Sequence, residues 1–152
     1  MQSRMILAAG GIVFRGGERQ QIAVVQLRKY RHWVLPKGKL KRNEHARNAA
    51  KREVLEETGH RVTVQEFIGA ISYESRGRPK IVQFWRMEVL GDSVCDPASD
   101  IKEVRWLSIK KAIEMLTYPR EQIFLRHIAN PTRRRRRLNG AVKAGSHRRR
   151  KH

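Results

Sequence analysis

The chain has 152 residues, of which 39% are hydrophobic and 32% charged, which is typical of one globular domain with a core of its own. Its 34 Lys+Arg and 14 Asp+Glu give a formal net charge of +20 at pH 7, which favours anionic ligands. The single cysteine, Cys95, excludes an internal disulfide framework, and no apolar run approaches the roughly 20 residues that span a bilayer. We therefore expect a cytoplasmic protein without membrane contact, or a nuclear one if the source is eukaryotic.

Five segments have the apolar and β-branched composition of strands, and turn residues separate them. They are residues 6–14, 21–28, 61–73, 80–90 and 101–108. The first, ILAAGGIVF, is apolar along its whole length, and we expect a buried strand rather than a signal segment. Residues 29–43 are expected to form a basic loop, broken by Pro36 and Gly38.

Three segments are predicted helices. Asn43 is a suitable N-cap for a helix over 44–58 that Gly59 ends, and Ser108 can cap a helix over 109–116. A last helix follows Pro119 and ends at Asn130-Pro131. One stripe of it is expected to hold Ile123, Phe124, His127 and Ile128. Strands outnumber helices and the long helix follows two strands directly, so the order predicts an α/β fold with a mixed sheet covered by helices.

The helix over 44–58 carries three glutamates close together. With ~100° of rotation per residue, Ala46, Ala49, Ala50 and Val54 define its packed face. The glutamates on that same face are Glu53, Glu56 and Glu57. Packed carboxylates cost several kcal/mol unless cations compensate, and Arg52, which can orient Glu56, cannot offset three charges. A solvated helix face with ion pairs is the alternative, but the pattern favours a site for two or more Mg²⁺ or Mn²⁺ ions.

A fixed spacing of glycine, glutamate and arginine runs through residues 38–60. Gly38 is followed after five residues by Glu44 and after seven more by Arg52-Glu53, and Glu56-Glu57 and Gly59 complete the pattern. It resembles the signature of the Nudix hydrolases, the MutT-like family, and the resemblance extends more loosely over most of residues 5–130. His60 departs from the family, which usually has an aliphatic residue there, and this affects packing rather than the carboxylates.

The resemblance implies a Nudix-type α/β/α sandwich around a mixed β-sheet, in a hydrolase domain over residues 1–130. It implies an enzyme that hydrolyses a phosphoanhydride bond in a nucleoside diphosphate linked to another moiety. The implied ligands of Mg²⁺ or Mn²⁺ are Glu53, Glu56, Glu57 and the Gly38 carbonyl. Arg52 would orient a glutamate, and Glu44 would support the loop–helix junction.

Two sources of the general base are open, because in this family it comes from the helix or from a separate loop glutamate. Glu103, just before VRWL, is the loop candidate, and an ordinary surface residue of a strand is the alternative.

The run from Trp33 to Gly38, WVLPKG, bears on the substrate. It is similar to family branches that act on dinucleoside polyphosphates, diphosphoinositol polyphosphates or, in some bacterial relatives, oxidised purine nucleoside triphosphates. Lys37 and Lys39 flank the expected metal-binding loop and are well placed to bind phosphates, although they could be ordinary solvated lysines. Arg28 could extend the basic rim, and Trp33 could stack a base or pack in the core. We expect a pyrophosphohydrolase of dinucleoside polyphosphates or of (oxidised) nucleoside triphosphates.

Residues 131–152 form a distinct basic tail with ten Lys and Arg and no acids, a composition that predicts disorder. The tail could serve nuclear import or hold an RNA for removal of its 5′ pyrophosphate. It could also make the chain a nucleic-acid-binding module with a Nudix-fold body. No aromatic residues lie between its charges for stacking on single strands, and the intact glutamate set favours an enzyme.

Overall fold

The structure, a computed structural model, describes residues 4–129. Within these residues, seven strands form one mixed sheet and three helices pack against it. The strands are β1 (Ile6–Arg15), β2 (Gln21–Leu27), β3 (Trp33–Val34), β4 (Lys37–Lys39), β5 (Val62–Ser75), β6 (Arg78–Val89) and β7 (Ile101–Leu107). The helices are α1 (Ala46–Thr58), α2 (Ile109–Met115) and α3 (Pro119–Ala129). In this described part of the chain, no helix is long and apolar enough to cross a membrane.

The main path of the sheet runs β3-β2-β1-β6-β5, with β4 paired to β1 and β7 paired to β2. β1 and β6 are parallel, in register from Ile6 opposite Lys80 to Phe14 opposite Glu88. The other strand pairs are antiparallel. β1 therefore lies in the middle of the sheet, which explains why its residues 6–14 are all apolar or glycine.

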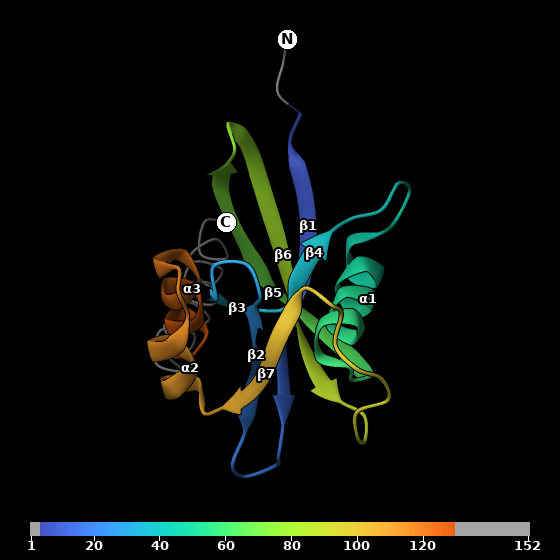
Figure 1. Cartoon of the computed structure of the whole chain (residues 1–152), viewed down its shortest axis with the longest axis vertical. Helices are drawn as coiled ribbons and strands as arrows, with labels where there is room; N and C mark the ends of the chain where they lie inside the picture. The colour runs from blue at the N-terminus through green and yellow to red at the C-terminus, as the bar shows by residue number, and fades with distance from the viewer. Residues whose placement is uncertain (1–3, 130–152) are drawn as a thin grey trace, which may run out of the picture.

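Helices cover both faces of the sheet: α1 lies on one side, and α2 and α3 lie on the other (Figure 1). Successive side chains of β1 point to opposite faces. Ala8 and Ile12 join the core cluster beneath α2 and α3, whereas Ala9 and Val13 join the cluster beneath α1. The α/β/α sandwich around a mixed sheet, expected from the sequence, is confirmed.

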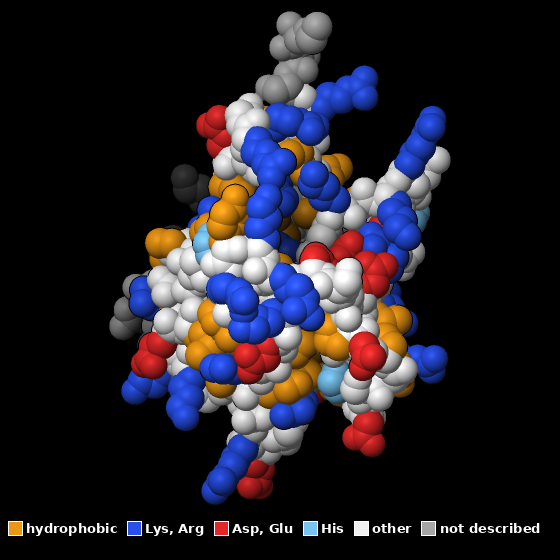
Figure 2. All heavy atoms as spheres, viewed as in Figure 1, with side chains coloured by type: hydrophobic (Ala, Val, Ile, Leu, Met, Phe, Trp, Pro, Cys, Tyr) orange, Lys and Arg blue, Asp and Glu red, His pale blue; other side chains and the backbone are white. Residues whose placement is uncertain are grey.

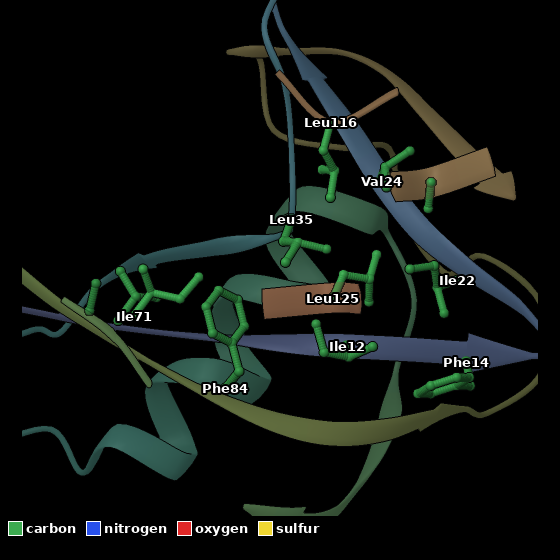
Figure 3. Close-up of a cluster of buried hydrophobic side chains, with 12 residues drawn as sticks. Ile12, Phe14, Ile22, Val24, Leu35, Ile71, Phe84, Leu116 and Leu125 are labelled. Carbon is green, nitrogen blue, oxygen red and sulfur yellow. The ribbon is translucent and has the colours of Figure 1, made fainter. Parts of the chain in front are cut away.

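The larger core cluster fixes α3 on the sheet. Figure 3 shows Leu125 of α3 pointing into this cluster beside Ile12 of β1 and Phe84 of β6. All three side chains are fully buried. Truncating a leucine buried in this way to alanine typically costs about 2–5 kcal/mol. The residues at the N-terminal end of α3 are thus held in a defined place relative to the strands.

Two expectations for the segment before α1 are wrong. Residues 29–43 are not all loop, because they contain β3 and β4, which pair with β2 and β1. The helix begins at Ala46, and Asn43 is not its N-cap but adopts a left-handed conformation with φ of 61°. Asn43 lies in a turn that Glu44 closes, since the Lys41 N–H donates to Glu44 Oε1 at 3.0 Å.

The expected ends of the helices are mostly confirmed. Gly59 ends α1 in a left-handed conformation with φ of 77°, and the Ser108 hydroxyl accepts a hydrogen bond from the Lys111 N–H at the start of α2. The expected stripe on α3 is wrong at Ile123, which is 63% exposed, and at His127, which is also exposed, because the buried positions of that helix are Glu121 and Leu125. The expected end at Asn130-Pro131 lies outside the described residues.

Candidate active site

The packed face of α1 carries carboxylates toward the sheet. Ala49, Ala50 and Val54 are fully buried against β1 and its neighbours, as their spacing indicated. Glu57 is buried on the same face, and the Glu53 side chain is 14% exposed. Glu56, at the margin of that face, is 44% exposed. The rotation of the helix therefore buries two of the three glutamates and leaves the third at the surface.

Arg52 bonds four other residues of this site through one guanidinium group. Its Nε and Nη2 donate to the two oxygens of Glu44 at 2.8 and 2.9 Å, a bidentate pair. Its Nη1 donates to Glu53 at 2.7 Å and to Glu56 at 3.2 Å, and Nη2 also reaches the Lys39 carbonyl at 3.2 Å. The hydrogen bond from Arg52 lowers the pKa of Glu44 to about 2. Arg52 thus orients Glu53 and Glu56 and ties both to the turn before the helix.

The β3–β4 turn, residues 35–38 with the first two residues of β4 included, lies so close to α1 and to β1 that each contact is made at a glycine. A Cβ added at Gly38 would collide with the carboxylate of Glu53. A Cβ added at Gly10 of β1 would collide with the Pro36 carbonyl and with Lys37. β4 is held there by pairing with β1, with Gly38 opposite Ala9. The backbone of Gly38 therefore lies directly against the carboxylate of Glu53.

Glu57 is the most deeply buried of the helix carboxylates. Its Oε1 accepts a hydrogen bond from the Lys37 backbone N–H at 3.1 Å. Burial raises its pKa to about 8; the charge and N–H of Lys37 act in the opposite direction, and Glu53 and Asp100 raise it further. Burial also raises the pKa of Glu53. In the absence of a cation, Glu57 therefore holds a proton at neutral pH.

The donor set of this site fits a hard divalent cation. Carboxylate oxygens are the ligands that Mg²⁺ and Mn²⁺ prefer, and a bound cation would replace the proton on Glu57. The Glu53 carboxylate occupies the place where a side chain at residue 38 would begin, so glycine lets this carboxylate lie directly against the backbone. Among residues 4–129 as arranged here, no three acidic, histidine or cysteine side chains converge tightly enough to hold an ion. Arg52 holds Glu53 and Glu56, and those side chains would have to rotate toward an ion.

The chain matches the family model of the NUDIX domain over residues 5–128. The chain belongs to the Nudix family. That family is typically dependent on divalent metals. The match does not test the expected domain boundary at residue 130, and the tail from 131 to 152 lies outside both the match and the described residues.

Curated and solved relatives agree with this assignment. The chain is 30% identical over 131 residues to the 8-oxo-(d)GTP phosphatase of Mycolicibacterium smegmatis, covering 80% of the chain and 40% of that protein. It is 26% identical over 120 residues to a bis(5′-nucleosyl)-tetraphosphatase of Caenorhabditis elegans, covering 75% of the chain and 87% of that protein. A crystal structure of a C. elegans Ap4A hydrolase binary complex superposes with a TM-score of 0.71 at 25% identity, covering 82% of this chain and 95% of that one. The chain spans only 40% of the length of the M. smegmatis protein and 51% of the length of another relative, the putative mutator protein MutT4 of Mycobacterium tuberculosis.

The two lysines expected to bind phosphates differ in their surroundings. The Lys37 ammonium group donates to Glu121 Oε2 at 2.7 Å and to the Leu35 carbonyl at 3.0 Å, and its side chain is 16% exposed. Lys39 is exposed, and its carbonyl accepts from Arg52. Lys39 is therefore the freer of the two to meet a phosphate.

The remaining expected site residues lie just after β2, in β3 and in β7. Arg28 Nε donates to the Ser99 carbonyl at 2.7 Å. Trp33 is half-buried against the larger core cluster, with the Arg105 guanidinium 4.8 Å from its ring centroid. Glu103 on β7 is 40% exposed and accepts from Arg105 Nε at 2.6 Å. The hydrogen bonds of Arg52 join Glu44, Glu53 and Glu56 directly. Arg28, Trp33 and Glu103 are held by other partners.

Sequence reasoning missed four residues near the site. Arg120 lies over the rings of Tyr73 and Tyr118, 3.7 and 4.2 Å from their centroids. Its neighbour Glu121 is 2% exposed and holds Lys37. One available signal was the position of Glu121 four residues before Leu125, which places an acid on the apolar stripe of α3. Tyr73 and Tyr118 are far apart in the chain, and no spacing rule connects them.

The departure from the family pattern at His60 has a local explanation. The His60 ring packs edge-on against Trp106, with centroids 5.3 Å apart and an angle of 81° between the ring planes. Its Nδ1 lies 3.0 Å from the Thr58 carbonyl. His60 thus packs at the end of α1 on Trp106, as an aliphatic residue would, and contacts none of the helix glutamates through these groups.

Proposed function

We propose that the chain is a divalent-metal-dependent pyrophosphohydrolase that cleaves a phosphoanhydride bond in a nucleoside diphosphate linked to another moiety. One observation carries this proposal: Arg52 bonds Glu44, Glu53 and Glu56 at once, while Glu57 and the Gly38 backbone complete the same site. Such a concentration of carboxylates in a chain of net charge +20 is costly without a cation to neutralise it.

Four groups would hold Mg²⁺ or Mn²⁺: Glu53, Glu56, Glu57 and the Gly38 carbonyl. When bound, such ions neutralise the diphosphate oxygens and make a water molecule more acidic. The protein's own groups do the rest. Arg52 fixes the orientation of Glu53 and Glu56, and the Lys37 N–H fixes one oxygen of Glu57. A carboxylate of α1, or Glu103, accepts the proton of the attacking water.

Dinucleoside polyphosphates and oxidised nucleoside triphosphates are the proposed substrates, since relatives bear the names Ap4A hydrolase and 8-oxo-(d)GTP phosphatase. Lys39 and Arg28 would meet phosphates, with Trp33 and Lys37 beside them. Figure 2 shows Lys and Arg side chains gathered over β1 and β6, beside acidic side chains at the upper end of α1. A basic surface next to the carboxylates favours a substrate with several phosphates.

The rings of Tyr73 and Tyr118 are the proposed stacking surface for a nucleobase, which would take the place that Arg120 now occupies. The rings of Tyr73 and Tyr118 already flank a flat cationic group. A purine is flat as well, and stacking on an aromatic side chain contributes about 1–3 kcal/mol per base. Glu121, next to Arg120 in the chain, bonds the Lys37 ammonium group, and the Lys37 backbone N–H bonds Glu57, so Lys37 connects this end of α3 to the carboxylate site.

The test is a hydrolysis panel with diadenosine polyphosphates, canonical and oxidised nucleoside triphosphates, ADP-ribose and 5′-triphosphorylated RNA. Mg²⁺ or Mn²⁺ is expected to support turnover and a chelator to abolish it. Glu56→Gln, nearly isosteric, should lower kcat by about 10²-fold or more while the protein stays folded. Glu66→Gln, at an exposed glutamate of β5, is the matched control and should retain full activity. Full activity of Glu56→Gln would exclude this site.

A further inference from the structure

Glu121 is a buried charged residue on α3, and the reaction described above does not use it. Its exposure is 2%, and both of its oxygens are engaged. Oε1 accepts from the Leu35 N–H at 3.2 Å, and Oε2 accepts from the Lys37 ammonium at 2.7 Å. A buried ion pair is rarely a net source of stability, because desolvation offsets most of the attraction. Its presence here therefore calls for another role.

The contacts of Glu121 are the last of a series that joins residues 32–37 to residues 117–121. Five hydrogen bonds make up the series. They link His32 Nδ1 and the Tyr118 hydroxyl (2.7 Å), Trp33 N–H and Thr117 Oγ1 (2.8 Å), Thr117 N–H and the Trp33 carbonyl (3.0 Å), and Leu35 and Lys37 with Glu121. α3 itself is anchored by the fully buried Leu125. The β3–β4 turn is thus held from the helix layer opposite α1.

The far end of this turn forms part of the carboxylate site. The Lys37 N–H donates to Glu57, and the Gly11 N–H donates to the Pro36 carbonyl at 3.2 Å. Gly38, the residue after Lys37, lies against the Glu53 carboxylate. Any movement of the turn therefore changes the positions of Glu57 and of the Gly38 carbonyl.

We propose that Glu121 is a positioning residue for the carboxylate site. By holding Leu35 and the side chain of Lys37, it fixes the turn so that the Lys37 N–H meets Glu57 and the Gly38 carbonyl stays beside Glu53. Lys37 then serves the site through its backbone, while its ammonium group is the anchor. This inference rests on the proposed function only in taking these carboxylates to bind a divalent cation.

The first measurement needs no metal. In Glu121→Gln, Oε1 can still accept from Leu35, but Lys37 loses its counter-ion and its anchor. Amide hydrogen exchange at Lys37 in the metal-free protein should become at least about tenfold faster. Glu114→Gln removes the same charge from an exposed position of α2 and should leave that rate unchanged. An unchanged rate at Lys37 in Glu121→Gln overturns the proposal.

The second measurement is Mn²⁺ binding by calorimetry, together with thermal unfolding. Glu121→Gln should bind Mn²⁺ about 10–100-fold more weakly than the wild type, the usual effect of losing a group that supports a ligand. The double variant Lys37→Met/Glu121→Gln leaves no buried charge without a partner, so its melting temperature should recover toward that of the wild type. Its Mn²⁺ affinity should stay low, because the turn remains without its anchor.

The double variant separates positioning from a purely structural role. If Mn²⁺ affinity recovers together with the melting temperature, Glu121 only stabilises the fold and the proposal is overturned. If the wild type binds no Mn²⁺ while exchange at Lys37 still accelerates in Glu121→Gln, the positioning of the turn is supported and the proposed function fails. The two ideas therefore fail by different results.

Discussion

Glu57 couples the site to pH through its buried carboxylate. Burial raises its pKa from 4.5 to about 8, so the folded protein holds this proton more tightly than the unfolded chain does. The resulting stabilisation is complete below pH 4.5 and is lost as the pH rises through about 8. We expect the melting temperature of the metal-free protein to fall across this window, by an amount equivalent to roughly a few kcal/mol.

Glu57→Gln tests this expectation, because an amide oxygen can still accept from the Lys37 N–H but does not ionise. In the presence of a chelator, the variant should lose less stability between pH 5 and 8 than the wild type. Mg²⁺ should flatten the wild-type curve, since a cation favours the ionised carboxylate. Parallel curves for the two metal-free proteins would show that Glu57 does not titrate in this range.

Glu103 is the candidate general base outside α1. If it activates the water, Glu103→Gln should lower kcat by about 10²–10⁴-fold and change KM little. The control is Glu88→Gln on β6, because Glu88 also pairs with an arginine two residues away and has a similar exposure of 38%. An unchanged kcat in Glu103→Gln would assign the role to a glutamate of α1.

At the scale of elements, the site depends on how closely β4 approaches α1. Gly38→Ala would place a methyl group against the Glu53 carboxylate, which is held by Arg52. We expect a loss of about 10–100-fold in Mn²⁺ affinity and activity, with an unfolding free energy lowered by only about 1–3 kcal/mol. Gly17→Ala adds the same methyl group at a turn where nothing lies within 4 Å; its φ of 43° makes alanine strained there, so this control should lose some stability but no activity. Equal activity in both variants would argue against a metal site beside Gly38.

The helix elements show what a sequence can predict. The packed face of α1 followed from the spacing of Ala49, Ala50 and Val54, because helical rotation is fixed locally. β3 and β4 were missed since strands of two and three residues form only by pairing with distant β2 and β1. Asn43 failed as a cap because the side chain of Glu44 closes a turn there instead.

The contacts of the site also divide into those that the sequence predicts and those that only the fold brings together. Arg52, Glu53, Glu56 and Glu57 lie within six consecutive positions of one helix, so their proximity is contained in the sequence. The pairing of Lys37 with Glu121 joins residues 84 positions apart, and only the packing of α3 against the sheet brings them together. The same packing places Arg120 between Tyr73 and Tyr118 in a way that no spacing rule states.

For the whole molecule, the distribution of charge separates the hydrolysis of small substrates from nucleic-acid binding. The site residues lie upstream of residue 130, whereas residues 131–152 carry ten Lys and Arg and no acid. Small substrates need only the site, so deleting residues 131–152 should leave hydrolysis of a dinucleoside polyphosphate within about twofold of the full chain. Nucleic-acid binding at low salt should weaken sharply, because each lost phosphate contact flattens the salt dependence of log K by roughly 0.7–0.9.

A full-length variant tests whether the charge of residues 131–152 or their mere presence determines nucleic-acid binding. Replacing all five residues from Arg133 to Arg137 with glutamine keeps the chain intact but removes half of the tail's basic side chains. Its affinity for RNA or DNA, measured at two salt concentrations, should fall between those of the full and truncated chains, since binding follows the number of phosphates neutralised.

Loss of small-nucleotide turnover on truncation, with the fold intact, would show that the tail takes part in the reaction. Tight nucleic-acid binding by the full chain only, with no turnover in either form, would instead support a nucleic-acid-binding module.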